Sequence, residues 1–147
     1  MFRMLTSTTR PLAVALAGAL AGCFTPTAEH MQGAPNIPVV ASSDAGVGIT
    51  VLANDFTFDQ SYTGPSQGDS LAVGLVVTSY SAGTALVEIV DSSGVKQFHR
   101  SVTTNLVEAQ SHSVLHVGLP ASVHVRFDHF SGVFVLGVYM NGVTVAN

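Results

Sequence analysis

Histidine is the residue of this chain best suited to metal chemistry. Four histidines fall in one short stretch: His112, His116, His124 and His129. If a three-residue turn joins the two strands expected around them, His116 lies opposite His124. Facing imidazoles can bind zinc or copper, and His129 or Asp128 would complete the shell. A four-residue turn would instead place His116 opposite Val125 and leave the histidines as solvated surface residues.

Three carboxylates flank a segment rich in glycine, serine and proline, NDFTFDQSYTGPSQGD: Asp55, Asp59 and Asp69. Calcium takes carboxylate oxygens as ligands, so this segment is a candidate calcium or ligand loop. Tyr62 in the same loop is expected to be exposed and could stack on a sugar. The spacing matches no EF-hand, and turn formation by Asp and Asn is the explanation we favour.

The residue types used for hydrolysis are present without their usual arrangement. Ser93 and Lys96 form S-x-x-K, but they lie at the tip and exit of an expected hairpin. Serine acyl-enzymes need a helix to place the lysine one turn from the serine. Nothing marks Glu88 and Glu108 as a glycosidase pair. The sequence predicts a non-enzymatic protein that needs no cofactor.

The elements that must position these residues are strands. After Gly46 the chain consists of short β-branched and aromatic runs separated by Gly, Ser, Asn and Asp, without helical periodicity. This pattern predicts an all-β domain over 47–147, an antiparallel two-sheet β-sandwich of jelly-roll or Ig-like type. We expect strands at 47–53, 55–60, 71–80, 84–91, 95–102, 112–119, 122–128 and 133–140, and a further strand at 142–146.

Two hairpin turns are expected, at Asp91-Ser92-Ser93-Gly94 and at Leu119-Pro120-Ala121-Ser122. The surrounding segments, ALVEIVDSSGVKQF and LPASVHVRFDHFSGVFVLGV, resemble hairpins of bacterial secreted β-sandwiches, including galactose-binding-like and pre-peptidase C-terminal domains. A D-x-x-G turn and a closing hairpin with Phe-Ser-Gly recur in those domains. The resemblance implies a sandwich fold and carries no function.

The segment 133–140 is apolar on both parities, apart from one glycine. A sandwich core covers only one face of a strand, so the second face is a candidate partner surface. The residues of one parity form this possible interface: Phe134, Leu136, Val138 and Met140. The alternative, weighted equally, is that both faces are buried within the monomer.

The only cysteine, Cys23, closes an apolar run that follows Arg3 and Arg10. Residues 11–20 are too few to span a bilayer as a mature helix, so residues 1–22 are predicted to be a secretory signal peptide. Because Cys23 is the only cysteine, the fold that follows it has no disulfide available.

The residues Leu20-Ala21-Gly22-Cys23 resemble the lipobox of bacterial lipoproteins. This resemblance implies a thioether-linked diacylglycerol on Cys23, removal of the preceding peptide, and anchoring in the cell envelope by acyl chains such as palmitate. Lipoproteins of this kind are retained at the inner membrane by an aspartate after the cysteine. Phe24 therefore implies the outer membrane, if the host has one.

Composition limits the partners of the mature chain. Removal of residues 1–22 leaves about 125 residues, the size of one domain. Three bases stand against nine acids, a formal charge of −6 with neutral histidines. This excludes nucleic acid and electrostatic docking on anionic lipid, so the membrane link must be covalent. Residues 23–46, with several prolines, are expected to be a flexible tether, in which 37–41 can form a first edge strand.

Together these features predict a lipid-anchored envelope protein with a structural, adhesive or assembly role, which contacts a protein partner or a second copy. The first alternative is a module that binds sugar or calcium through the loop with Asp55, Asp59, Tyr62 and Asp69. The second is a metal-binding protein that uses the histidine cluster.

Overall fold

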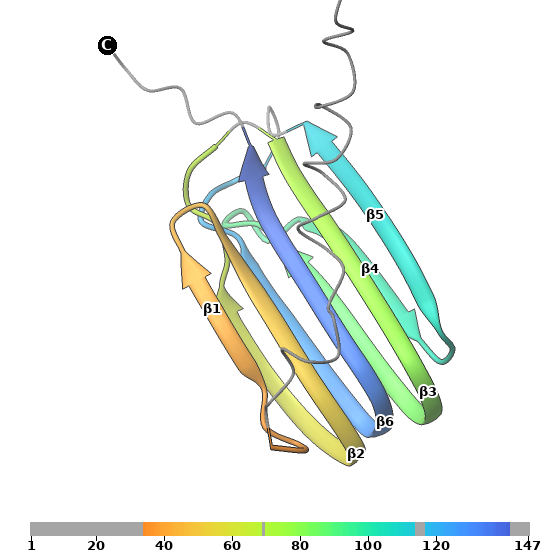
Figure 1. Ribbon diagram of the computed structural model, residues 1–147. Helices are drawn as coiled ribbons and strands as arrows, with labels where there is room; N and C mark the ends of the chain where they lie inside the picture. The colour runs from red at the N-terminus through yellow and green to blue at the C-terminus, as the bar shows by residue number, and fades with distance from the viewer. Residues whose placement is uncertain (1–33, 69, 114–116, 142–147) are drawn as a thin grey trace, which may run out of the picture. The chain divides into compact units, whose positions relative to one another are not determined.

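The computed structural model describes residues 34–68, 70–113 and 117–141. The regular structure of these residues is β throughout, which confirms the predicted all-β class (Figure 1). The strands are β1 (Val39–Ser43), β2 (Gly46–Thr63), β3 (Ser70–Val90), β4 (Lys96–Val102), β5 (Leu106–Ser113) and β6 (Ser122–Asn141). A helix able to cross a membrane is not found in the described ranges. The signal-like segment, Cys23 and the strand expected at 142–146 lie outside the described residues.

The six strands form one antiparallel sheet, in the order β1-β2-β6-β3-β4, and β5 also pairs with β3. β6 occupies the centre, because β2 pairs with it on one side and β3 on the other over nearly their whole lengths. The expected antiparallel pairing is therefore confirmed.

The three long strands, β2, β3 and β6, each turn back near their middle. The backbone at the bends is left-handed, with φ of 50° at Asp55, 52° at Ser79 and 48° at His129. Positive φ interrupts the extended backbone of a strand and bends it. The ladders shift register at the same level, and all three bends lie at one end of the sheet in Figure 1. The sheet is therefore folded over along one line.

Folding gives two facing layers of strand arms. We call the first, which consists of β1, β5 and the arms 46–53, 70–78 and 132–141, layer 1. We call the second, which consists of β4 and the arms 56–63, 82–90 and 122–130, layer 2. Figure 1 shows the two arms of each long strand lying one in front of the other.

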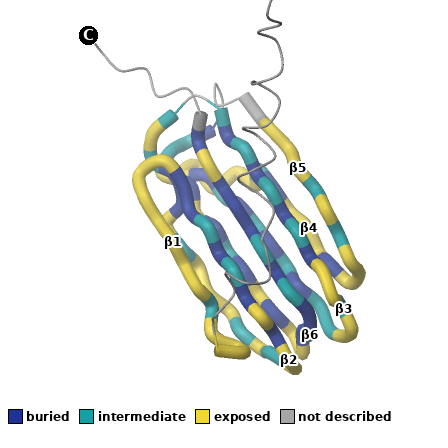
Figure 2. Tube along the Cα trace, in the orientation of Figure 1, coloured by how far each residue is buried: buried dark blue, intermediate teal, exposed yellow. Residues whose placement is uncertain are grey.

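The hydrophobic core lies between the two layers. Alternate residues of each arm point inward, as Val47, Ile49 and Val51 do in β2, with 1% exposure or less. Phe127 of layer 2 meets Phe134 of layer 1 edge to face, with ring centroids 4.9 Å apart. Each side chain of this kind stabilises the fold by about 1.5–3 kcal/mol when buried. Figure 2 shows the resulting alternation of buried and less buried residues along the strands.

Six of the expected strands are the arms of the three long strands. The pairs 47–53 with 55–60, 71–80 with 84–91, and 122–128 with 133–140 correspond to β2, β3 and β6. Asn, Asp, Ser and Gly residues interrupt the sequence pattern at each bend. Backbone pairing nevertheless resumes in the same partner strand beyond the bend, so the arms belong to one sheet.

The strand expected at 112–119 is not found as a unit: residues 112 and 113 end β5, residues 117–119 are not in a strand, and residues 114–116 lie outside the described ranges. Instead, β5 covers Leu106–Ser113 and pairs with β3, and the expected hairpin with 122–128 does not form, because β6 pairs with β2 and β3. The sequence pattern did not predict β5, because in this edge strand an apolar residue points to solvent and an acidic residue points inward. Val107 is 81% exposed, whereas Glu108 is largely buried and pairs with Arg100 of β4 at 2.7 Å between Oε2 and Nε.

The edge strand expected at 37–41 forms at β1, two residues later, and pairs with the first residues of β2. Part of the segment expected as a tether therefore belongs to the sheet. Each residue of β1 is exposed, since only one side of this strand has a neighbour.

The turn at Asp91 confirms the expected hairpin between β3 and β4. One oxygen of the carboxylate, Oδ1, accepts hydrogen bonds from the backbone N–H groups of Ser93 and Val95, each at 2.9 Å. The other, Oδ2, accepts from the side chain of Gln97 at 2.8 Å. Gly94 supplies the positive φ, 84°, that closes the turn. These donors, with the Ser93 hydroxyl first, hold the pKa of Asp91 well below its usual range.

Candidate functional site

Most of the acidic, basic and histidine side chains of the described strands lie on the outward surface of layer 2, which we call the charged face. Its arms bury one residue parity in the core, so the other parity points to solvent. The ionisable residues at these outward positions are Asp59, Glu88, Lys96, His99, His124, Arg126 and Asp128. They come from four neighbouring strands, and register brings several of them into contact.

Glu88 is the centre of the charged face, opposite His124 in β6 and His99 in β4. Its Oε1 accepts a hydrogen bond from Lys96 and lies 2.8 Å from Nδ1 of His99. Its Oε2 lies 3.6 Å from Nδ1 of His124. The hydrogen bonds from Lys96 and then His99 lower the pKa of Glu88 to about 2. Glu88 is therefore ionised at every physiological pH.

The chain of contacts extends from Glu88 to the outer arm of β2. His124 lies between two carboxylates, because its Nε2 is 2.6 Å from Oδ1 of Asp59. The arrangement is open to water, with 61% of the Asp59 side chain and 52% of the His99 side chain exposed. Ion pairs of this kind are screened and contribute little to stability.

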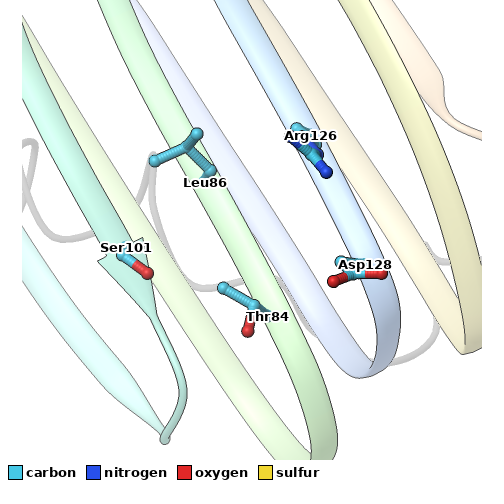
Figure 3. A pocket seen from close by; sticks show the side chains of 5 residues that line it. All are labelled: Thr84, Leu86, Ser101, Arg126 and Asp128. Atoms are coloured by element: carbon cyan, nitrogen blue, oxygen red, sulfur yellow. The ribbon is translucent and has the colours of Figure 1, made fainter.

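A shallow pocket lies on the charged face (Figure 3). It is lined by Thr84 and Leu86 of β3, Ser101 of β4, and Arg126 and Asp128 of β6. A guanidinium, a carboxylate and two hydroxyls can hydrogen-bond a small polar molecule. The lining contains no aromatic ring of the kind that stacks on a sugar.

A separate ion pair, away from the charged face, joins the bends of β2 and β6. Nδ1 of His129 lies 2.8 Å from Oδ1 of Asp55, and the backbone N–H of His129 donates to the hydroxyl of Thr57 at 3.2 Å. The backbone N–H of Asp55 donates to the hydroxyl of Ser131 at 2.8 Å. The Asp55 carboxylate, with a smaller contribution from Asp128, raises the pKa of His129. These contacts hold two neighbouring bends together.

The histidines predicted as a metal cluster occupy different parts of the fold. His124 lies on the charged face and His129 at a bend. His112 belongs to β5 in layer 1, opposite Leu71, while its side chain and the whole of His116 lie outside the described residues. In the ranges that the structure describes, no three His, Cys, Asp or Glu side chains are grouped so as to hold a metal ion.

The expected calcium or ligand loop is largely a strand. Asp55, Asp59 and Tyr62 all belong to β2, which continues to Thr63, and Asp69 lies outside the described residues. The ring of Tyr62 packs against the core, and its burial raises the pKa of the phenol. The expectation of an exposed ring at Tyr62 is therefore wrong. Asp55 and Asp59 each contact a histidine instead.

The possible interface of Phe134, Leu136, Val138 and Met140 is wrong, because these side chains form part of the core and are at most 4% exposed. The residues of the other parity, including Val133 and Val135, point outward from layer 1. Residues 133–140 are apolar on both parities because one parity fills the core and the other belongs to an outward surface that carries no charge.

This outward surface of layer 1, which we call the uncharged face, has no charged side chain at any described position. One row of paired residues crosses its five strands: Val39, Thr50, Val135, Val76 and Val107. The next row contains only small residues: Ala41, Gly48, Gly137, Gly74 and Ala109. Seven large apolar side chains of the described residues are exposed, and four belong to this face: Val39, Leu52, Val107 and Tyr139.

Sequence reasoning missed the contact between Glu88 and His99. The hairpin turn at Asp91 gives part of the signal, because it places β3 and β4 side by side. Counting back and forward from this turn would set Glu88 opposite Phe98. The register shifts between Ile89 and Val90, however, and this irregularity brings His99 opposite Glu88. The contact with His124 could not be found this way, because β3 and β6 are far apart in sequence.

No protein family model matches this chain, and no curated protein matches it either. Among solved structures, the chain is similar to the capsular polysaccharide assembling protein CapF from Staphylococcus aureus, with a TM-score of 0.31 and 10% identity. The similarity covers 77% of this chain and 30% of that chain, so this chain spans less than a third of the length of CapF. A TM-score of this size indicates neither a shared fold nor a shared function.

Proposed function

We propose that this chain is a lipid-anchored protein of the bacterial cell envelope whose β domain acts by contact, as a structural, adhesive or assembly component. The observation that carries the proposal is the signal-like segment that ends in Leu20-Ala21-Gly22-Cys23. In this proposal, peptide 1–22 is removed, Cys23 receives the acyl chains, and the following residues tether the domain. Two or three acyl chains make a durable anchor, whereas one binds only reversibly.

The domain itself is, in this proposal, a β-sandwich of jelly-roll or Ig-like type. The supporting observation is that the folded sheet encloses one apolar core between two layers, which is the packing that defines a sandwich. A rigid sandwich with two broad outward faces suits a protein that contacts others.

The chemistry of the two faces supports a role in contact, without a catalytic step or a cofactor. The carboxylate and imidazole groups around Glu88 are open to water and satisfy one another, as in a surface ion-pair network. The uncharged face presents apolar side chains to solvent, which is typical of surfaces that meet a partner. The acidic balance of the mature chain argues against nucleic acid as that partner.

The anchor is tested by changing Cys23→Ala in the full chain expressed in a bacterium with two membranes. We expect the variant to leave the detergent phase in a detergent partitioning assay, because no thiol remains to be acylated. It should accumulate as an uncleaved precursor or as a soluble product. Unchanged partitioning of this variant into the detergent phase would refute the proposal.

Phe24→Asp is the matched control next to the anchor. This variant keeps the cysteine, so it should stay in the detergent phase. We expect this variant to change membrane. Separation of the two membranes should show the variant at the inner membrane and the parent chain at the outer membrane. A parent chain found at the inner membrane would contradict the outer-membrane part of the proposal alone.

A further inference from the structure

We propose that the uncharged face of layer 1 is the surface on which this chain associates with a second copy of itself. This inference rests on the proposed function, because it names the partner that a contact-forming envelope protein would bind. It goes beyond that function by assigning the contact to one side of the sheet.

Charge distinguishes the two faces as surfaces for self-association. A two-fold symmetric contact pairs a patch with its own copy. On the charged face, such a contact would have to remove charged groups of both signs from water, carboxylates as well as Lys96 and Arg126, and this desolvation is costly. The described outward positions of the uncharged face carry no charge at all. Two copies of a chain with a formal mature charge of −6 can therefore meet there without facing like charges.

The uncharged face is also large enough for a stable pair. Five strands about 4.8 Å apart, with three outward residues in β1 and about four in each of the others, spaced about 6.8 Å along the strand, cover roughly 25 by 25 Å. Two such faces would bury about 1,200 Å² or more in total, against the roughly 1,000 Å² that a specific interface needs.

The exposed apolar side chains favour burial of this face. Val107 is 81% exposed and Val39 is 54% exposed, at opposite edges of one row that crosses all five strands. Between them lie Thr50, Val135 and Val76, each partly exposed. A second sheet laid across this row would remove apolar area from water over its whole width. The adjoining row of alanines and glycines allows the backbones to approach closely.

A lipid surface is the less favoured occupant. The described outward positions of this face include no lysine or arginine, so they offer nothing that attracts anionic headgroups. A second copy needs no such attraction.

Two threonines provide a matched test in the full chain. Thr50 on the uncharged face and Thr84 on the charged face are both partly exposed strand residues that point outward. Each is replaced in turn by a photo-crosslinking amino acid, and cells carrying the full chain are irradiated. We expect a product with twice the mass of the chain from position 50 and little from position 84.

Introduction of a charge into the contact provides the second part of the test. With the photo-crosslinking residue moved to position 107, Thr50→Lys should reduce the double-mass product about tenfold or more, because two lysines would face each other. Thr84→Lys should leave it unchanged. Equal far-UV circular dichroism and equal thermal midpoints of the two lysine variants would show that folding is not the cause.

Several outcomes would overturn the inference: no product from position 50, equal yields from both positions, a product of another mass, or cross-links to phospholipid alone. Membrane fractionation of the same cells tests separately whether the chain is anchored in a membrane. A soluble chain that still gives the double-mass product would refute the anchor and leave self-association standing. An anchored chain that gives no double-mass product would refute self-association and leave the anchor standing.

Discussion

Single residues at the bends of this fold combine strained backbone with an ion pair. His129 has φ of 48° and pairs with Asp55, whose own φ is 50°, so both partners sit in a conformation that non-glycine residues rarely adopt. Side-chain contacts between neighbouring bends offset part of that strain. The pair is exposed, so its effect is electrostatic and depends on pH.

The pair predicts a titration. Asp55→Asn should lower the pKa of His129 towards its ordinary value of about 6.5, because the main cause of the raised pKa is removed. Since the folded pKa is raised, the pair stabilises the fold below the ordinary histidine pKa, and this contribution is lost as pH rises through the raised value. NMR titration of the imidazole measures the pKa of His129 in the parent protein and in the Asp55→Asn variant. Asp59→Asn, which removes the partner of His124 instead, should leave the His129 curve in place. A His129 pKa that does not move in Asp55→Asn would show that Asp55 is not its cause.

At the residue scale, the sequence predicted types of residue better than their contacts. Asp91 was predicted to close a hairpin, and it does, because a D-x-x-G turn is defined within four residues. The contacts of His124 with Asp59 and Glu88 join three strands that are distant in sequence, so no local pattern contains them. The expected pairing of His116 with His124 failed for the same reason, since it assumed a hairpin between neighbouring segments.

The folded-over strands are the feature of the elements that decides the architecture. At the bend of β3, Gly83 has φ of 77°, and a Cβ atom there would overlap the backbone carbonyl of His129 in β6. Close approach of two bending strands therefore requires a residue without a side chain.

Gly83→Ala should destabilise the domain by about 3 kcal/mol or more, because left-handed strain adds to a clash with backbone that cannot move aside. Gly94→Ala is the matched control. Gly94 has φ of 84°, but nothing lies within 4 Å of the added Cβ, so only the conformational cost of about 1–2 kcal/mol remains. Urea unfolding of both variants measures the difference. Equal losses in the two variants would mean that the bends do not approach as closely as described.

The elements themselves were predictable to different degrees. Runs of β-branched and aromatic residues between Gly, Ser, Asn and Asp predicted the arms of β2, β3 and β6. That the arms belong to continuous strands could not be predicted, since the polar residues of a bend look the same as those of a loop. β5 was misplaced because Glu108 faces inward at an edge, where Arg100 pairs with it.

At the scale of the whole molecule, the two layers separate an uncharged face from a charged one, with the core between them. The position of the core fixes which parity of β6 can be changed safely. Leu136 is 1% exposed, whereas its neighbour Val135 lies on the uncharged face.

Leu136→Lys should therefore unfold the domain, because an unpaired buried charge costs several kcal/mol and small domains hold only about 5–15 kcal/mol in total. Val135→Lys should leave the domain folded, since its side chain points to solvent. Far-UV circular dichroism and size-exclusion chromatography distinguish the two results. A folded Leu136→Lys variant would mean that the inward and outward parities of β6 are reversed.

The proposed role of the whole molecule depends most on the proposed modification of Cys23, which lies outside the described residues. The intact mass of the protein purified from envelope membranes tests it most directly. We predict a polypeptide that begins at Cys23 and carries two or three acyl chains. A polypeptide that begins elsewhere, or that has an unmodified thiol at Cys23, would contradict the proposal of a lipid-anchored envelope protein.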